Sequence, residues 1–333
     1  MDVPTFVPDG YEVRQRLGAG QTSIVWLAQH GATKRQVALK LPRDDVRTNA
    51  VLRRMFENEV QITLKLDHPN VVRAFDGHPT GDRAFLALEY CPGGTLDQLL
   101  LEQGRQPMER ALQLVGDVTL GLEHTHLKQV LHRDVKPANV FLNEASRAKL
   151  GDFGTGTFAA DATDERVGTA FYMAPEIFQG SSPTVQSDVY SLGVLAYEVL
   201  SGERPFVGDS YDALMVAHLT SLPRDLRHVR EDLPRGLSAV ITRAMSRDAS
   251  RRFQSVAAFG EAFRAGIGTN GGVKATSDVE ATRGTLPGRA GRGAAAPPAP
   301  AKPAPSARDE ASEDRPEAAR KGGLFGWFRR RKS

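Results

Sequence analysis

Apolar and polar side chains alternate with a period of two in the first part of the chain, the pattern typical of half-buried β-strands. Glycines lie at the first turn between these runs, where they favour a tight connection. One longer segment instead has apolar residues at helical spacing from Leu52 to Leu64, and Pro69 follows it. The pattern predicts strands at 11–17, 24–28 and 36–41, a helix at 49–66, and strands at 71–75 and 84–88.

After Pro92-Gly93-Gly94 the apolar residues recur with the period of an α-helix over long segments. A sheet-rich first part followed by a mainly helical second part indicates the α+β class. The predicted helices of the second part are 109–128, 187–200, 211–220, 237–245 and 255–265.

The composition changes again near Gly266, from which Gly, Ala, Pro, Ser and Thr dominate as far as Arg320. A segment with almost no aromatic residues cannot bury enough apolar surface to offset the entropy lost on ordering. We therefore expect a disordered linker at 266–320. The remaining residues, 321–333, combine Leu324, Phe325, Trp327 and Phe328 with a basic cluster and form a separate tail.

The net charge of +3 belongs to this tail, because 321–333 holds five of the 43 Lys and Arg residues and none of the 40 acidic ones. A basic, aromatic segment is typical of contact with an anionic membrane surface or an acidic partner. A solvated chain end is the alternative for the same residues. The rest of the chain has no excess of cations, which argues against nucleic acid as a partner.

Location is indicated by what the sequence lacks. Cys91 is the only cysteine, so no intrachain disulfide ties the chain to an oxidising compartment. The acidic start at Met1-Asp2 is unlike a signal peptide, and the apolar stretch 189–200 is shorter than the roughly 18–20 residues of a spanning helix. We expect a cytoplasmic protein without a transmembrane segment, with peripheral membrane association through the tail as a further expectation.

Three motifs follow one another in the second part of the chain. His132-Arg133-Asp134-Val135-Lys136-Pro137-Ala138-Asn139 is followed by Asp152-Phe153-Gly154 and then by Ala174-Pro175-Glu176. This order resembles the catalytic loop, metal-binding loop and activation-segment end of a eukaryotic-like Ser/Thr protein kinase of the bacterial type. The resemblance covers 11–265 and implies a two-lobed kinase fold. Its N-lobe, about 11–90, would hold an antiparallel sheet plus one helix, and its C-lobe, about 95–265, would be mainly helical.

The resemblance implies transfer of the ATP γ-phosphoryl group to protein Ser or Thr hydroxyls with Mg²⁺, including autophosphorylation. A catalytically inactive scaffold of the same fold and a small-molecule kinase are the alternatives. The first usually lacks Lys40, Asp134 or Asp152, and this chain has all three. The pair of Thr169 and Lys136 matches the Ser/Thr subclass and argues against the second.

Each catalytic role is assigned by the same resemblance. Asp134 would accept or orient the substrate hydroxyl, and Lys136 would stabilise the transferred phosphoryl charge. Asn139 and Asp152 would offer the hard oxygen ligands that Mg²⁺ prefers.

Lys40 lies in an apolar strand, where an unpaired ammonium group would be costly, so it needs anionic partners. The resemblance makes Glu59 on the following helix its partner, with the nucleotide phosphates on the other side. Glu57 is a competing candidate on another helix face, and a lysine extending from a sheet edge to solvent is the bland alternative.

Nucleotide contacts follow in the same way. Gly18-Ala19-Gly20 would let backbone amides approach phosphates, although a plain hairpin turn explains these glycines equally well, and Ser23 stands where the family usually has a third glycine. The segment 88–91 would bind the adenine edge through its backbone, with Leu88 at the back of the pocket. The complete expected set is Leu17, Gly18, Ala19, Gly20, Val25, Ala38, Lys40, Glu89, Cys91 and Phe141.

Regulation would involve Arg133, which resembles the arginine that receives an activation-segment phosphate. Thr163 is the first candidate phosphosite, Thr155 and Thr157 are weaker ones, and Thr169 would position the substrate. The alternative is constitutive ordering, since acidic residues already crowd the segment at Asp161, Asp164 and Glu165.

Two further residues receive structural roles from the resemblance. Glu176 would form an ion pair with Arg252 late in the chain. Asp188 would brace the backbone of the catalytic loop.

Overall fold

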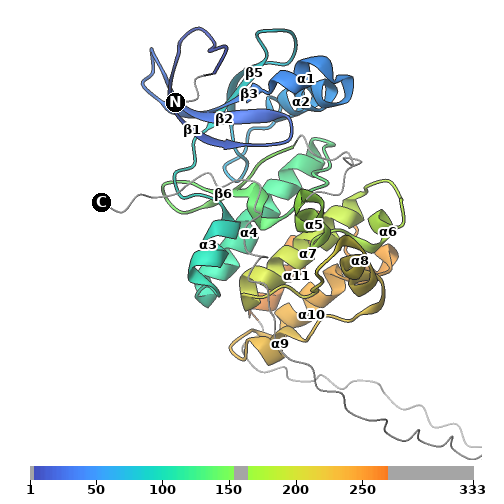
Figure 1. The fold of residues 1–333 in the computed structure, drawn as a ribbon. Helices are drawn as coiled ribbons and strands as arrows, with labels where there is room; N and C mark the ends of the chain where they lie inside the picture. The colour runs from blue at the N-terminus through green and yellow to red at the C-terminus, as the bar shows by residue number, and fades with distance from the viewer. Residues whose placement is uncertain (1–3, 154–163, 269–333) are drawn as a thin grey trace, which may run out of the picture. The chain divides into compact units, whose positions relative to one another are not determined.

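The structure is a computed structural model that describes residues 4–153 and 164–268. Its first part, which we call the N-lobe, contains one antiparallel sheet with the strand order β1-β2-β3-β5-β4 (Figure 1). The strands are β1 (Tyr11–Ala19), β2 (Ser23–His30), β3 (Gln36–Pro42), β4 (Ala74–His78) and β5 (Phe85–Glu89). Both faces of this sheet carry apolar side chains, so the alternating pattern of the sequence sorts them into two clusters.

Strand β3 shows why the sheet can hold a charged group. Leu39 points to one face, where it packs with Trp26. Ala38 and Lys40 point to the opposite face, where Ala38 packs with Val25. The lysine is thereby directed to the side of the sheet that faces the rest of the candidate site.

Two helices follow β3, α1 (Asp44–Thr48) and α2 (Ala50–Thr63) (Figure 1). The side chain of Asn49 caps α2 by accepting hydrogen bonds from the backbone of Val51 and Leu52. The buried face of α2 includes Met55, Phe56, Glu59, Val60 and Thr63. A carboxylate therefore lies within an otherwise largely apolar stripe.

The second part, which we call the C-lobe, is mainly helical. Its central helix α7 (Val185–Ser201) is buried from Ser187 to Ser201, so it forms the middle of the main hydrophobic core. The other helices are α3 (Leu96–Gln103), α4 (Met108–Leu127), α5 (Asp164–Ala170), α6 (Pro175–Phe178), α8 (Tyr211–Thr220), α9 (Leu226–Val229), α10 (Arg235–Ala244) and α11 (Val256–Ile267). A small hairpin of β6 (Val140–Leu142) and β7 (Ala148–Leu150) follows a 3₁₀ turn at Pro137–Asn139, and a second such turn spans Ala249–Arg251.

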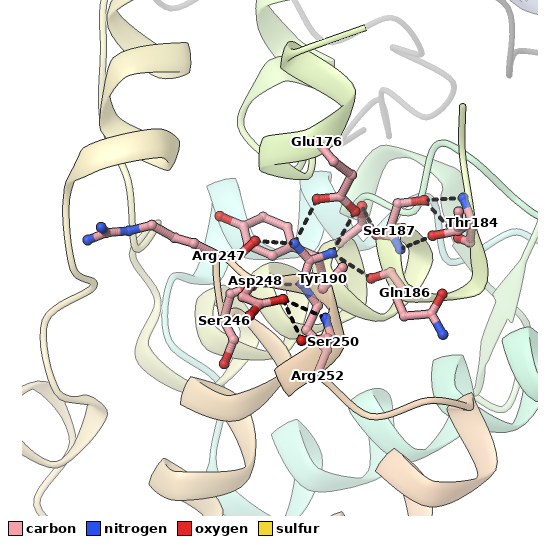
Figure 2. Close-up of polar contacts among 12 residues, drawn as sticks. Glu176, Thr184, Gln186, Ser187, Tyr190, Ser246, Arg247, Asp248, Ser250 and Arg252 are labelled. Carbon is pink, nitrogen blue, oxygen red and sulfur yellow. Dashed lines mark hydrogen bonds and ion pairs between the residues drawn. The ribbon is translucent and has the colours of Figure 1, made fainter. Parts of the chain in front are cut away.

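A buried arginine ties α6 to the end of the C-lobe (Figure 2). Both terminal nitrogens of Arg252 lie 2.7 Å from the two carboxylate oxygens of Glu176, and its guanidinium carbon lies 4.8 Å from the centre of the Tyr190 ring. The arginine also donates to the backbone carbonyl oxygens of Gln186, Ser246 and Arg247. This confirms the predicted ion pair.

The fold agrees with the predicted α+β class, a five-stranded antiparallel sheet with one long helix followed by a mainly helical lobe. The predicted strand 71–75 is misplaced, because β4 begins only at Ala74, and Val71 instead forms a bridge with Leu150 of β7. The last helix continues to Ile267, two residues into the predicted linker. Thr155, Thr157, Thr163, the linker from 269 and the tail 321–333 lie outside the described residues.

None of the helices in the described ranges, 4–153 and 164–268, is long and apolar enough to cross a membrane.

Candidate active site

The loop that carries the candidate base lies between α4 and β6, and α7 holds it in place. Asp188 accepts hydrogen bonds from the backbone N–H groups of His132 at 2.9 Å and Arg133 at 2.8 Å. Its carboxylate also lies 2.7 Å from Nε2 of His126. Arg133 has the left-handed backbone conformation, with φ of 69°, which side chains rarely adopt without such support. The predicted brace is thereby confirmed.

His132 points inward from this loop. Its Nδ1 accepts a hydrogen bond from the backbone N–H of Asp134 at 3.3 Å, so Nε2 carries the proton and donates to the carbonyl oxygen of Gly151 at 3.0 Å. Burial lowers the pKa of His132, although nearby Asp188 opposes the shift. A neutral imidazole therefore links the catalytic loop to the residue before Asp152.

Asp134 is held ionised by its neighbours. Its Oδ2 lies 2.8 Å from Nζ of Lys136 and accepts a hydrogen bond of 2.9 Å from Nδ2 of Asn139. Burial alone would raise the pKa of Asp134, but the ammonium group of Lys136 outweighs burial, so the pKa lies below its ordinary value. The result is a fixed carboxylate at neutral pH.

Lys136 also reaches the last turn of α5. Its Nζ donates to Oγ1 of Thr169 at 2.7 Å. One ammonium group therefore bridges Asp134 and Thr169, the contact expected for Lys136. A bond from Thr169 to Asp134 stays a prediction.

A second group of charges lies on the N-lobe side. Lys40 donates a hydrogen bond to Glu59 of α2, and its Nζ lies 3.4 Å from Oδ1 of Asp152. Burial alone would lower the pKa of Lys40, but the carboxylates of Asp152 and Glu59 outweigh it and raise the pKa. Glu57, the competing candidate, lies instead 3.9 Å from Arg53. The structure therefore confirms the predicted pair of Lys40 and Glu59 and rejects both alternatives for Lys40, while the contact with Asp152 was not predicted.

Asp152 is presented by an unusual backbone. Its φ is 66°, and the preceding Gly151 donates its N–H to the carbonyl oxygen of Asn139 at 2.9 Å. A Cβ atom at Gly151 would lie 2.9 Å from Val72 and 3.0 Å from Phe141, so a larger residue would displace the sheet-side wall. The glycine thus fits between Val72 and Phe141 while its N–H joins the backbone before Asp152 to Asn139.

These two residues are chemically suited to Mg²⁺. Asn139 uses Nδ2 for its bonds to Asp134, which leaves its carbonyl oxygen as the atom that a metal would take. No group of three or more His, Cys, Asp or Glu side chains suited to a metal ion is found in the described part of the chain. Such a sparse oxygen set fits Mg²⁺, which is usually held by one or two protein oxygens together with phosphates and water.

A pocket lies beside the charged group formed by Lys40, Glu59 and Asp152. It contains about 480 Å³ of empty space, part of it open to solvent. Its described lining is Ala38, Lys40, Glu59, Thr63, Val72, Leu88, Glu89, Cys91, Phe141, Gly151 and Asp152. The pocket is thus apolar along one wall and charged at one end, which suits a ligand with a flat ring and an anionic group.

Residues 11–263 match the family model described as protein kinase domain. The chain belongs to this family. It is 34% identical over 268 residues to serine/threonine-protein kinase PknB of Mycobacterium leprae, a match that covers 77% of this chain and 43% of that protein. It is 35% identical over 256 residues to PknA of Corynebacterium glutamicum, covering 73% of this chain and 53% of that protein. The chain thus spans about half the length of these curated relatives.

A crystal structure of the Mycobacterium tuberculosis PknI kinase domain is also similar. The TM-score is 0.62 with 27% sequence identity, and the match covers 80% of this chain and all of that one. The kinase fold is therefore supported by sequence and by structure.

The glycine-rich turn of the kinase domain forms the hairpin between β1 and β2. Gly18 pairs with Val25, and the N–H of Gly20 donates to the carbonyl oxygen of Ser23 at 2.7 Å. Leu17 and Val25 join Ala38, Cys91 and Phe141 in one apolar cluster. The described lining of the pocket does not include Leu17, Gly18, Ala19, Gly20 or Val25. Their contact with a nucleotide stays a prediction.

The segment between the lobes carries an ion pair that the sequence did not reveal. Nζ of Lys149 on β7 lies 2.8 Å from Oε2 of Glu89, and both side chains are largely buried. Burial raises the pKa of the nearby Cys91 thiol to about 12, and Glu89 adds to the shift, so the thiol stays neutral. Val72 and Thr63 also line the pocket without having been predicted. No sequence motif marks these residues, because only the folded chain brings them together.

Proposed function

We propose that this kinase domain transfers the γ-phosphoryl group of ATP to serine or threonine hydroxyls of proteins, with Mg²⁺. The observation that carries the proposal is a pair of charged groups joined by the backbone. Lys40, Glu59 and Asp152 meet at the pocket, and Asp134 binds Lys136, which also binds Thr169. Asn139 links the two groups, because its side chain binds Asp134 and its backbone carbonyl oxygen binds the N–H of Gly151, the residue before Asp152. The curated relatives are named serine/threonine-protein kinases, which supports the same reaction.

In this proposal the chain's residues divide the work. Asp134, ionised because Lys136 lowers its pKa, accepts a hydrogen bond from the acceptor hydroxyl and takes its proton as transfer proceeds. Lys136 also stabilises the negative charge of the phosphoryl group in transit, and Thr169 fixes the position of its ammonium group. Lys40, held by Glu59, binds the phosphates.

Asn139 and Asp152 would hold Mg²⁺ through their side-chain oxygens. When bound, the ion neutralises phosphate charge. The backbone groups of Glu89 and Cys91 would bind the adenine edge, and Leu17, Val25, Ala38 and Phe141 would pack against the ring.

A direct assay tests the proposal. Purified full-length protein is incubated with γ-labelled ATP, Mg²⁺ and a general protein acceptor, and Asp152→Asn is run in parallel. We expect label on Ser or Thr from the wild type only, while circular dichroism shows both proteins folded. If the folded wild type transfers no label but still binds ATP, the inactive scaffold replaces the kinase. Label on small molecules but not on protein would favour the small-molecule kinase.

Two finer parts of the proposal concern residues outside the described ranges. Autophosphorylation is proposed between Thr155 and Thr169, first at Thr163, with Arg133 as receptor for the phosphate. Mass spectrometry of the active enzyme, together with the activity of Thr163→Ala, decides this. The tail 321–333 is proposed to contact an anionic membrane surface or an acidic partner. Loss of anionic-vesicle binding on truncation after Arg320, with unchanged kinase activity, would support it.

A further inference from the structure

An arginine outside all of the sequence motifs lies against the segment that follows α5. Arg204 comes from the loop after α7, and its Nε donates to Oε1 of Glu198 at 3.1 Å. Its guanidinium carbon lies 4.0 Å from the centre of the Phe171 ring and 5.9 Å from that of Tyr172. A hydrogen-bonded ion pair and a cation–π contact therefore hold the same side chain.

Glu198 needs this cation. Its side chain is only 10% exposed, and burial raises its pKa, while Arg204 is the first group to oppose that shift. Its other oxygen, Oε2, accepts the hydroxyl hydrogen of Tyr172. Burial raises the pKa of Tyr172 well above the ordinary value, so its hydroxyl remains a donor. Each oxygen of Glu198 is thus occupied by a group of the protein itself.

The last turn of α5, which leads directly into this segment, touches the catalytic loop. Thr169 binds Lys136, and the backbone N–H of Tyr172 donates to the carbonyl oxygen of Thr169 at 3.0 Å. Arg204 thus contacts the turn 169–172, and Thr169 at the start of this turn binds Lys136, the lysine that also binds Asp134.

We propose that Arg204 is a positioning residue for the protein acceptor. It holds the turn Thr169–Tyr172 in the shape that receives the acceptor chain next to Asp134, and this proposal rests on the function proposed above. Because Lys136 binds both Asp134 and Thr169, the first residue of this turn, the residues flanking the acceptor hydroxyl would lie close to the turn. Arg204 fills the place of a cation beside Glu198 from within the protein, so the acceptor itself needs no basic residue there.

The proposed positioning role of Arg204 predicts an effect that packing of its side chain alone would not produce. Without Arg204, Glu198 becomes a largely buried carboxylate without a cation, which is unfavourable unless another cation takes its place. The missing cation can come from solution as a guanidinium compound or from an arginine of the acceptor peptide. Loss of Arg204 should therefore create a preference for acceptor peptides that contain arginine, which the wild type lacks.

The experiment compares steady-state kinetics of full-length wild type, Arg204→Ala, Arg204→Lys and Arg243→Ala. Arg243 of α10 is the matched control, because it also makes a cation–π contact, with its guanidinium carbon 4.3 Å from the centre of the Phe253 ring. Two acceptor peptides are used that differ only by arginine or alanine at positions next to the phosphorylated residue. For Arg204→Ala we expect the KM for the alanine peptide to rise about tenfold, the size of one lost charged contact, with an unchanged KM for ATP.

The expected rescue is specific. Methylguanidinium in solution should lower the raised peptide KM of Arg204→Ala, and the arginine peptide should be the better substrate of this variant by several-fold. Arg204→Lys should be intermediate, since it keeps the charge but not the planar group. Arg243→Ala should match the wild type on both peptides.

The other outcomes distinguish failure of the proposed kinase function from failure of the proposed role of Arg204. A wild type that phosphorylates no peptide or protein refutes the proposed function itself. An active wild type whose peptide KM is unchanged in Arg204→Ala refutes the role of Arg204. The role is refuted too if Arg204→Ala loses ATP and peptide binding together, or if Arg204→Lys and methylguanidinium restore nothing, since general loss of structure would explain both results.

Discussion

Replacement of Arg252 by methionine should be among the most destabilising single changes in the C-lobe. Methionine keeps much of the length of the side chain and its packing against Tyr190, so the change mainly removes the charge and the donors. Arg252 is fully buried, and it donates to both oxygens of Glu176 and to three backbone carbonyl groups.

The expected loss follows from those contacts. Removing one partner of a buried ion pair costs ~3–5 kcal/mol, because the other charge stays buried without compensation. Glu176 is partly exposed at 20%, and water can reach its carboxylate, so we take the lower half of this range. For a domain of about 250 residues, ~3–4 kcal/mol corresponds to a melting temperature lowered by about 10 °C.

The adjacent Arg251 provides the control. Its side chain is 80% exposed, and its Nε lies 3.6 Å from Asp248, a surface pair of the kind worth ~0–1 kcal/mol. Urea and thermal unfolding of full-length wild type, Arg252→Met and Arg251→Met, followed by circular dichroism, give the comparison. The reasoning is refuted if the two variants lose the same stability, or if Arg252→Met loses less than about 1 kcal/mol.

Lys40→Met and Glu59→Ala should each reduce phosphoryl transfer strongly. The double variant should lose little more activity than either single variant, since the two residues act as one unit. A double variant whose activity falls by the product of the two single losses would contradict this. Lys149→Met should raise the KM for ATP more than it lowers kcat, because it removes the ion-pair partner of Glu89 beside the predicted adenine-binding backbone. Its control is Arg147→Met, which loses the ion pair with Asp117 next to β7 and should leave the KM for ATP unchanged. Burial lowers the pKa of His218 from 6.5 to about 4, so the unfolded chain binds a proton that the folded chain does not, and stability should fall as pH decreases from about 6.5 to about 4. The urea midpoint of His218→Gln should depend less on pH across this window; an equal slope in both proteins would assign the effect elsewhere.

Sequence patterns were most informative for long elements. Tyr211–Thr220 has the predicted bounds, and α7 differs from its prediction by a residue or two at each end, because long apolar periodicity and capping residues such as Thr184 are local properties. Strand β4 was misplaced because Val71 and Val72 are apolar for a different reason, their contact with β7. Pattern alone cannot say which strand an apolar segment will meet.

The residues of the candidate site were likewise predicted only in part. The catalytic-loop motif placed Asp134, Lys136 and Asn139 together, since residues close in sequence within a loop of known type carry their own geometry. Lys149 with Glu89 was missed, because that pair joins residues far apart in the chain and Lys149 belongs to no motif. Arg204 was missed for the same reason, and the carboxylate that needs it is visible only once α7 is seen to be buried.

The bonds of Asp188 have a consequence for how the protein becomes active during folding. The catalytic loop takes its shape from a residue on α7, more than fifty positions later in the chain, so it cannot acquire that shape from local interactions. A chain in which α4 has formed but α7 has not yet docked would have helical circular dichroism and an unformed loop around Asp134. Recovery of phosphoryl transfer should therefore report on the completed C-lobe rather than on the appearance of helices, and a ribosome-bound chain that ends before α7 would be inactive however well its N-lobe had folded.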